Sequence, residues 1–187
     1  MKNVFIIHGI NGIPKIAFWL KNKLEALGAD VTLPSFPPQE GASYDNWSEV
    51  LDKYRDSIKD DTIFVCHSIG NEFIIKYLVR NNLHIDTYIS LAGFAEIFIN
   101  EGRDVLNKVV EHFHVTSDEV RKFISLTNRR YSFYSDNDHI VPLDVLENYP
   151  KTINAEPIFI PNIGHMGSKS GLESFPELLR LVKDNLR

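Results

Sequence analysis

The most informative residue of this 187-residue chain is Ser68, which stands in the segment Val65-Cys66-His67-Ser68-Ile69-Gly70. Before it, residues 62–65 form an unbroken apolar run typical of a strand that is buried on both faces. After it, apolar residues recur at helical spacing from Ile69 to Leu78. A strand that turns directly into a helix lifts the intervening hydroxyl out of the sheet and points helix N–H groups toward developing negative charge. The segment therefore predicts a serine nucleophile suited to attack on a carbonyl.

The turn departs in one place from the G-x-S-x-G pattern of such nucleophiles. Cys66 stands where the first glycine is expected, whereas Gly70 occupies the second glycine position. Taken alone, the turn is equally compatible with Ser68 acting only as the N-cap of a helix. Partner residues must decide between these interpretations.

Acidic and histidine side chains follow two later strands of the predicted sheet. Residues 130–134 are rich in aromatics and lead into a polar turn that holds Asp136 and Asp138. Residues 157–160 form another short apolar strand, and His165 lies in the glycine-containing loop after it. Because parallel strands bring their carboxyl ends to one edge of a sheet, we expect these side chains to meet the serine there.

The three residue types together favour nucleophilic catalysis. A serine hydroxyl needs an imidazole to accept its proton, and the imidazole needs a carboxylate to hold its tautomer and stabilise its charged form. We therefore predict a triad of Ser68, His165 and one acid, with His165 as base and then acid. The residues alone leave Asp136 and Asp138 open as that acid.

Five short segments and one tryptophan carry a resemblance that spans nearly the whole chain. They are His8-Gly9, Cys66-His67-Ser68-Ile69-Gly70, Ser90-Leu91-Ala92-Gly93-Phe94-Ala95, Asp138-His139-Ile140-Val141-Pro142, Gly164-His165 and Trp47. These segments resemble those of the small serine hydrolases of the YdeN and retinoblastoma-binding-protein-nine type. The resemblance implies a compact alpha/beta-hydrolase without a large lid and a triad of Ser68, Asp138 and His165, in which Asp138 begins the D-x-x-V-P pattern. The family is expected to have Ala or Gly before the His-Ser pair, so Cys66 is a departure.

A fourth element lies near the start of the chain. Residues 3–7 form a buried-type strand, and the loop His8-Gly9-Ile10-Asn11-Gly12 follows before a helix over residues 14–27. In hydrolases this loop and the residue after the nucleophile each donate a backbone N–H to the oxyanion. The predicted donors are Ile10 and Ile69. The alternative is a tight turn in which His8 only hydrogen-bonds the loop.

Alternating strand and helix patterns predict an α/β fold in one domain over residues 1–187. The strands are expected at residues 3–7, 30–33, 62–66, 87–91, 130–134 and 156–160, with helices on both faces of the parallel sheet as a three-layer structure. Right-handed crossovers and the hydrolase resemblance predict the strand order 2-1-3-4-5-6.

The longest connection, residues 94–128, is predicted to hold two helices. The second begins at Thr116-Ser117-Asp118-Glu119, which has the spacing of a capping box. Two interpretations remain for this segment: a small helical cap that walls the acyl pocket, or an ordinary crossover whose apolar faces pack on the core.

Composition narrows the partners and the compartment. A net charge of -5 argues against nucleic acid or an anionic membrane as the main partner. The single Cys66 excludes an internal disulfide, and burial at a strand end argues against it as the nucleophile.

With neither a signal peptide nor a membrane-spanning run in the pattern, we expect a soluble cytoplasmic protein. Neither His112-Phe113-His114 nor His139 has a ligand framework around it, so we expect no metal and no other cofactor.

The sequence thus predicts a metal-independent serine hydrolase that cleaves carboxylic esters or related acyl compounds through an acyl-enzyme on Ser68. Its partner would be a small-molecule acyl substrate. Two alternatives stay open: a thioesterase or small peptidase or amidase with the same triad, and an interaction protein built on a hydrolase scaffold.

Overall fold

Six parallel strands form the central sheet of the computed structural model, which describes residues 2–97, 104–167 and 170–187. The strands are β1 (Asn3–Ile7), β2 (Asp30–Thr32), β3 (Ile63–His67), β4 (Ile85–Leu91), β5 (Thr127–Tyr134) and β6 (Glu156–Phe159). Their order in the sheet is β2-β1-β3-β4-β5-β6, which confirms the predicted order. The boundaries differ from the predicted ones mainly at the amino ends of β4 and β5, which begin earlier.

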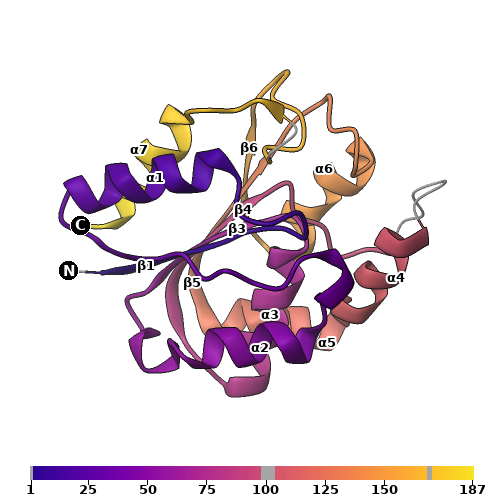
Figure 1. The fold of residues 1–187 in the computed structure, drawn as a ribbon, viewed down its shortest axis with the longest axis horizontal. Coiled ribbons are helices and arrows are strands. Elements are labelled where there is room, and N and C mark those ends of the chain that lie inside the picture. The colour runs from indigo at the N-terminus through magenta and orange to yellow at the C-terminus, as the bar shows by residue number, and fades with distance from the viewer. Residues whose placement is uncertain (1, 98–103, 168–169) are drawn as a thin grey trace.

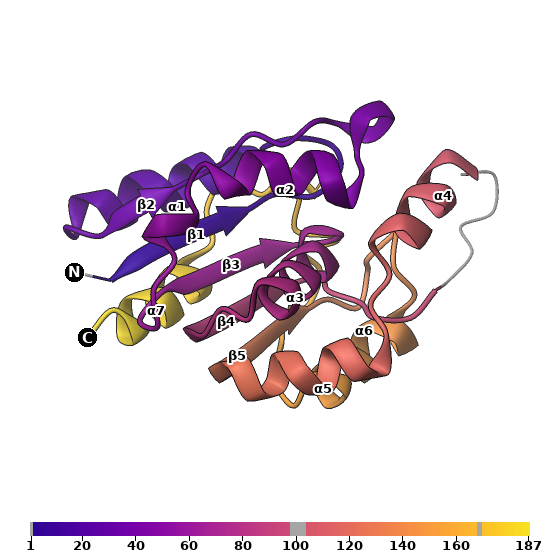
Figure 2. The same ribbon diagram turned by 90° about the horizontal axis from the view of Figure 1, so that it is seen from below.

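The registers of the central strands bring their carboxyl ends level with one another. Ile7 of β1 pairs with Cys66 of β3, and Cys66 pairs in turn with Ser90 of β4. Figure 2 shows the arrowheads of these strands at one side of the molecule, whereas both chain termini lie at the other side. The loops that leave β1, β3, β4 and β5 therefore gather at a single edge of the sheet.

Helices cover both faces of the sheet (Figure 1). One face carries α1 (Lys15–Ala26) and α7 (Pro176–Asn185), and the other carries α2 (Tyr44–Asp52), α3 (Gly70–Asn81), α5 (Ser117–Leu126) and α6 (Leu143–Thr152). Two apolar clusters fill the space between these layers and the sheet. Fully buried rings such as those of Trp47 and Phe73 each stabilise the fold by about 1.5–3 kcal/mol relative to exposed ones.

The long connection after β4 contains the two expected helices, α4 (Asp104–Phe113) and α5, while residues 98–103 lie outside the described part of the chain. The capping box at α5 is present, since the Thr116 hydroxyl accepts the backbone N–H of Glu119 and the Glu119 carboxylate accepts that of Thr116. Helix α5 packs on α3 and β5, as a crossover helix does, whereas α4 contacts α3 and the short 3-10 helix η1 (Gln39–Gly41).

The short helix η2 (Arg55–Ser57) completes the elements before β3. Among the helices that the structure describes, none combines the length and the apolar character that crossing a bilayer requires.

Candidate active site

Ser68 occupies a strained turn between β3 and α3. Its backbone φ is 55°, a left-handed value that costs a residue other than glycine about 1–2 kcal/mol. The turn brings α3 so close to β1 that a Cβ on Gly70 would lie 2.8 Å from the carbonyl oxygen of His8. The second glycine of the pattern is therefore required by space. Cys66 is completely buried, so the first glycine position tolerates a small side chain here, and burial raises the pKa of its thiol well above the usual range.

Ser68, His165 and Asp138 form a continuous chain of hydrogen bonds. The Nε2 atom of His165 lies 3.0 Å from the Ser68 Oγ, and its Nδ1 lies 2.7 Å from the Asp138 Oδ2. The carboxylate can only accept from Nδ1, so in the neutral imidazole the proton sits on Nδ1 and Nε2 is free to accept the serine proton. The arrangement can thus transfer a proton from the hydroxyl to the ring.

The environment of Asp138 keeps it ionised. Burial alone would raise the pKa of this carboxyl, because its side chain is only 1% exposed. The hydrogen bond and the charge of His165 outweigh burial, as do the backbone N–H groups of Val141 at 3.0 Å and Ile140 at 2.8 Å, so the pKa is lowered overall. The turn itself therefore supplies the donors that hold the charged acid in place.

The three residues before Asp138 tie its loop to the loop of His165. The Asp136 carboxylate accepts the backbone N–H of Asn162 at 2.9 Å, the Ser135 hydroxyl accepts that of Ile163 at 3.1 Å, and the Asn137 side chain accepts that of Gly164 at 2.7 Å. Asp136 thus faces the backbone of the histidine loop, whereas Asp138 faces the imidazole. Residues alone did not separate these two acids, and the positions of Ser135 and Asn137 were not anticipated.

The peptide between Gly9 and Ile10 is fixed through its carbonyl. That oxygen accepts from the Nδ1 of His8 at 2.6 Å and from the Gly12 N–H at 3.3 Å. The backbone N–H of Phe36 donates to the Nε2 of His8 at 3.0 Å, which leaves the ring proton on Nδ1, and burial lowers the pKa of this histidine so that it stays neutral. Because the peptide is trans, the Ile10 N–H points in the opposite direction from the held carbonyl.

The peptide between Ser68 and Ile69 is fixed in the same way. The Ser68 carbonyl accepts from both the backbone N–H and the side-chain amide of Asn71, at 3.0 Å and 2.8 Å. Tyr88 donates its hydroxyl to the Asn71 Oδ1 at 2.7 Å and so fixes that amide. Within the described part of the chain, the N–H groups of Ile69 and Ile10 donate to no other residue. Sequence reasoning missed Asn71, because a polar residue in the first turn of a helix carries no signal for such a role.

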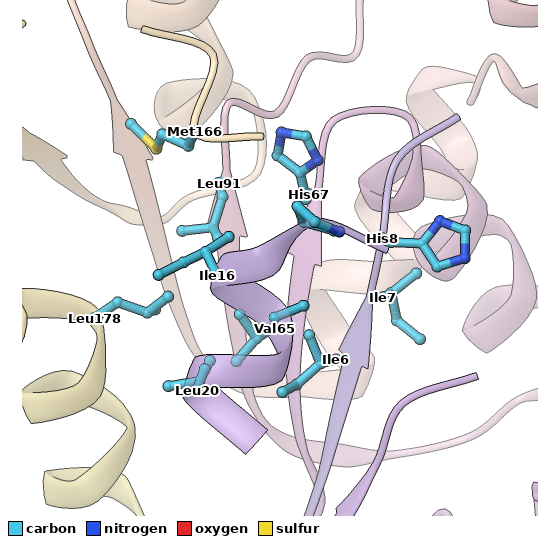
Figure 3. A pocket seen from close by; sticks show the side chains of 12 residues that line it. Ile6, Ile7, His8, Ile16, Leu20, Val65, His67, Leu91, Met166 and Leu178 are labelled. Carbon is cyan, nitrogen blue, oxygen red and sulfur yellow. The ribbon is translucent and has the colours of Figure 1, made fainter. Parts of the chain in front are cut away.

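A small apolar cavity lies beside the turn, on the α1 side of the sheet (Figure 3). Its volume is about 20 Å³, and its lining includes Leu20, Val65, Leu91 and Met166, with the His67 ring at its upper end. A space of this size holds about one water molecule, and a lining with so few polar partners favours a dry cavity. Ser68 is not among its lining residues, so this cavity is no acyl pocket.

Metal ligation has no framework among the described residues, where no group of three or more His, Cys, Asp and Glu side chains is arranged to hold an ion. At the carboxyl ends of the strands the structure places the serine, the imidazole, the carboxylate and the backbone N–H groups of Ile10 and Ile69.

The strand order, the strained serine turn and the loops at the carboxyl edge define an alpha/beta-hydrolase fold. Residues 4–184 match the model of the serine hydrolase family, and the chain belongs to that family. The chain is 25% identical over 179 residues to YdeN of Bacillus subtilis (strain 168), which covers 94% of this chain and 91% of YdeN. The crystal structure of the ydeN gene product superposes with a TM-score of 0.88 at 24% identity, covering 100% of this chain and 99% of that one.

More distant structures share the fold at lower identity. A serine-to-alanine mutant of the meta-cleavage product hydrolase CumD of Pseudomonas fluorescens IP01 superposes with a TM-score of 0.72 at 14% identity, over 100% of this chain and 90% of that one. A structure from a study of carboxylesterases of Nitrososphaera gargenis gives 0.71 at 12% identity, over 99% of this chain and 89% of that one. The chain is thus a hydrolase by family, and the predicted resemblance is confirmed.

Proposed function

We propose that this chain is a carboxylesterase-type serine hydrolase that forms an acyl-enzyme on Ser68. The observation that carries the proposal is the hydrogen-bond chain from Ser68 through His165 to Asp138, because it couples a hydroxyl to a base whose tautomer is held by an ionised acid. Family membership supports the hydrolytic class of reaction. The carboxylesterases of N. gargenis, which share the fold, suggest esters as the first substrates to test.

In the proposed reaction the Ser68 Oγ attacks the acyl carbon of an ester as its proton passes to the Nε2 of His165. Collapse of the tetrahedral intermediate breaks the bond to the leaving alcohol oxygen, which receives that proton. Water then attacks the acyl-enzyme while His165 accepts its proton, and the acid leaves as Ser68 regains its hydrogen. Asp138 stabilises the imidazolium that forms in each half of the cycle.

Backbone donors supply the second part of the proposed catalysis. The N–H groups of Ile10 and Ile69 would receive the negative charge of the tetrahedral oxygen. Because both peptides are held through their carbonyls, these donors need not reorganise during the reaction. One such donor is typically worth a factor of about 10²–10³ in kcat.

We also propose that the chain is one hydrolase domain in which residues 94–128 border the acyl side of the site. The support is connectivity: the segment leaves the carboxyl end of β4, where the Leu91 carbonyl accepts the Ser68 N–H at 3.0 Å. Truncating the exposed side chain of Ile97 in this segment, in Ile97→Ala, should change the preferred acyl length of the ester while leaving serine labelling intact.

A fluorophosphonate probe tests the main proposal, because it reacts with activated serines and not with ordinary ones. The probe should label the folded wild-type protein at Ser68 and abolish turnover of p-nitrophenyl esters. Ser68→Ala should prevent both, with an unchanged circular dichroism spectrum, whereas Ser125→Ala, at an exposed serine on α5, should change neither.

The other outcomes of this experiment are equally informative. Labelling at Ser68 with hydrolysis of thioesters or amides, and not of esters, would keep the nucleophile and replace the leaving group. Absence of labelling on folded protein would overturn the proposal and favour a binding role for the scaffold.

A further inference from the structure

A second imidazole, that of His67, is bonded to the backbone of His165. The His67 Nε2 lies 2.7 Å from the carbonyl oxygen of His165, although the two residues are 98 positions apart in the chain. Since a carbonyl can only accept, Nε2 carries the proton and donates it. The two rings meet edge to face, with centroids 5.0 Å apart and planes at 61°. His67 therefore contacts both the backbone and the ring of the proposed base.

Two glycines make the space for the His67 ring. A Cβ on Gly9 would lie 3.0 Å from its Nδ1, and a Cβ on Gly167 would lie 2.7 Å from its Cε1. Neither glycine has a positive φ, so space and not backbone conformation is what these positions require. Figure 3 shows the ring above the small apolar cavity. The imidazole is thus enclosed between the loop after β1 and the loop that carries His165.

The His67 ring is uncharged, which is favourable for a group that contacts the proposed base His165. Burial, followed by the proximity of His165, lowers the pKa of His67 to about 3. The ring is neutral at every pH at which an esterase would be assayed. It consequently adds no positive charge next to the imidazolium that forms on His165 during the reaction.

The loop of His165 is now held on both sides. Before the histidine, the side chains of Ser135, Asp136 and Asn137 accept the backbone N–H groups of residues 162–164. At the histidine itself, the carbonyl accepts from His67. These bonds act on opposite ends of the segment that sets the direction of the His165 side chain.

We infer that His67 is a positioning residue, whose hydrogen bond to the His165 carbonyl holds the Nε2 of His165 within reach of the Ser68 hydroxyl. The inference rests on the proposed function. A displacement of about 1 Å in a catalytic group can lower a rate by about 10²-fold. Loss of this bond should therefore reduce kcat without a matching change in KM, because the bond acts on the backbone that directs the His165 ring.

A matched pair of variants separates the hydrogen bond from the bulk of the ring. Gln and Met have similar length and flexibility, but only Gln can donate to the carbonyl. His67→Met should lower kcat and the rate of fluorophosphonate labelling about 10- to 100-fold, while KM and the one-to-one labelling stoichiometry stay unchanged. His67→Gln should recover most of the loss. His84→Met, at an exposed histidine before β4, controls for the substitution itself.

A substitution at Gly167, which lies against the His67 ring, provides an independent test. Gly167→Ala should push the ring away from the His165 carbonyl and lower kcat in the wild-type background. In a His67→Ala background the added methyl group meets no ring, so its further effect should be small. Such non-additivity would show that Gly167 acts through His67.

The results distinguish this inference from the proposed function. If the wild-type protein labels at Ser68 while His67→Met and Gly167→Ala both retain the wild-type kcat, His67 has no positioning role and the hydrolase proposal stands. Equal losses in His67→Gln and His67→Met would also overturn the role of the hydrogen bond. If His67→Met does not fold, the inference is tested by His67→Gln and by Gly167→Ala in the wild-type and His67→Ala backgrounds. A wild-type protein that fails to label overturns the proposed function itself.

Discussion

Two carboxylates, Asp138 and Asp86, lie at opposite ends of the strands, Asp138 after the carboxyl end of β5 and Asp86 near the amino end of β4. Both have a lowered pKa. In each case burial alone would raise the pKa, and a favourable partner outweighs it. For Asp138 the main partner is the imidazole of His165. For Asp86, near the amino end of β4, the partners are Lys2 at 2.7 Å and Arg129 at 2.5 Å.

The two carboxylates differ in whether the partner can transfer a proton to a third group. The ammonium of Lys2 and the guanidinium of Arg129 can only donate to Asp86, and these bonds join β4 to the start of the chain and to β5. The partner of Asp138 has a second nitrogen that faces a hydroxyl. In this chain the lowered pKa therefore marks a candidate site at Asp138, whose partner can pass a proton onward, and a structural ion pair at Asp86.

Replacing Asp138 should give the largest loss of kcat among the variants considered. In Asp138→Asn the new amide would donate to Nδ1 of His165, which would leave the ring proton on Nε2, facing the Ser68 Oγ. We expect kcat for an ester to fall by about 10⁴, the loss known for this change in a well-studied triad. The measurement is steady-state kinetics after the circular dichroism spectra have been matched. A loss below tenfold would contradict the role of Asp138.

The same replacement at Asp86 should lower the stability of the fold and not kcat. Asp86→Asn leaves Lys2 and Arg129 facing a neutral amide, and we expect the free energy of unfolding to fall by about 1–2 kcal/mol, a modest loss because these groups are partly exposed. Urea unfolding measures it. The kcat should stay within about twofold, since distant sites rarely couple. A large loss of kcat would remove the contrast between the two acids.

Acid pH provides a control on the origin of that stability. The folded-state pKa of Asp86 lies below its unfolded value near 3.9, so its contribution is complete above about pH 4 and is lost as pH falls through the folded pKa. Asp138 contributes in the same direction. The free energy of unfolding of Asp86→Asn should therefore fall less steeply below pH 4 than that of the wild type. Identical slopes would mean that the pair with Lys2 does not stabilise the fold.

Asp136 lies in the same loop as Asp138 but holds a backbone N–H instead of the imidazole. Asp136→Asn keeps an oxygen that can accept the Asn162 N–H, so we expect kcat to fall by only about threefold. Asp136→Ala, which removes the acceptor and frees the histidine loop, should cost more than Asp136→Asn. If Asp136→Asn instead matched Asp138→Asn, the assignment of the acid would be wrong by two residues.

The smallest effect on rate is expected at Cys66, which is buried on the same side as Ser68 but takes no part in the proposed proton transfer. Cys66→Gly should fold, with a free energy of unfolding lower by about 1–2 kcal/mol from lost burial and added chain flexibility. Its kcat should remain within about threefold of wild type, as measured on the same ester. Complete inactivation of a folded variant would reveal a role for the thiol.

Local patterns predicted much of the fold because they depend on neighbours in the chain. The apolar runs of β1 and β3 predict buried strands, the capping box at Thr116 marks the start of α5, and the turn at Ser68 follows from a strand that meets a helix without a loop. The placement of Ser68, Asp138 and His165 at strand ends follows from the same reasoning, since parallel strands share one edge.

Contacts between residues that are far apart in the chain become visible only in the folded structure. Only the folded loops separate Asp136, which holds the backbone at Asn162, from Asp138, which holds the imidazole of His165. The bond from His67 to the His165 carbonyl joins residues 98 positions apart, and no local periodicity encodes such a contact. The sequence is sufficient to predict which residue types lie at the carboxyl ends of the strands, because each follows its own strand in the chain. Which atoms then meet depends on how the loops pack against one another, and that is settled by sterics and hydrogen bonds that form only in the folded chain.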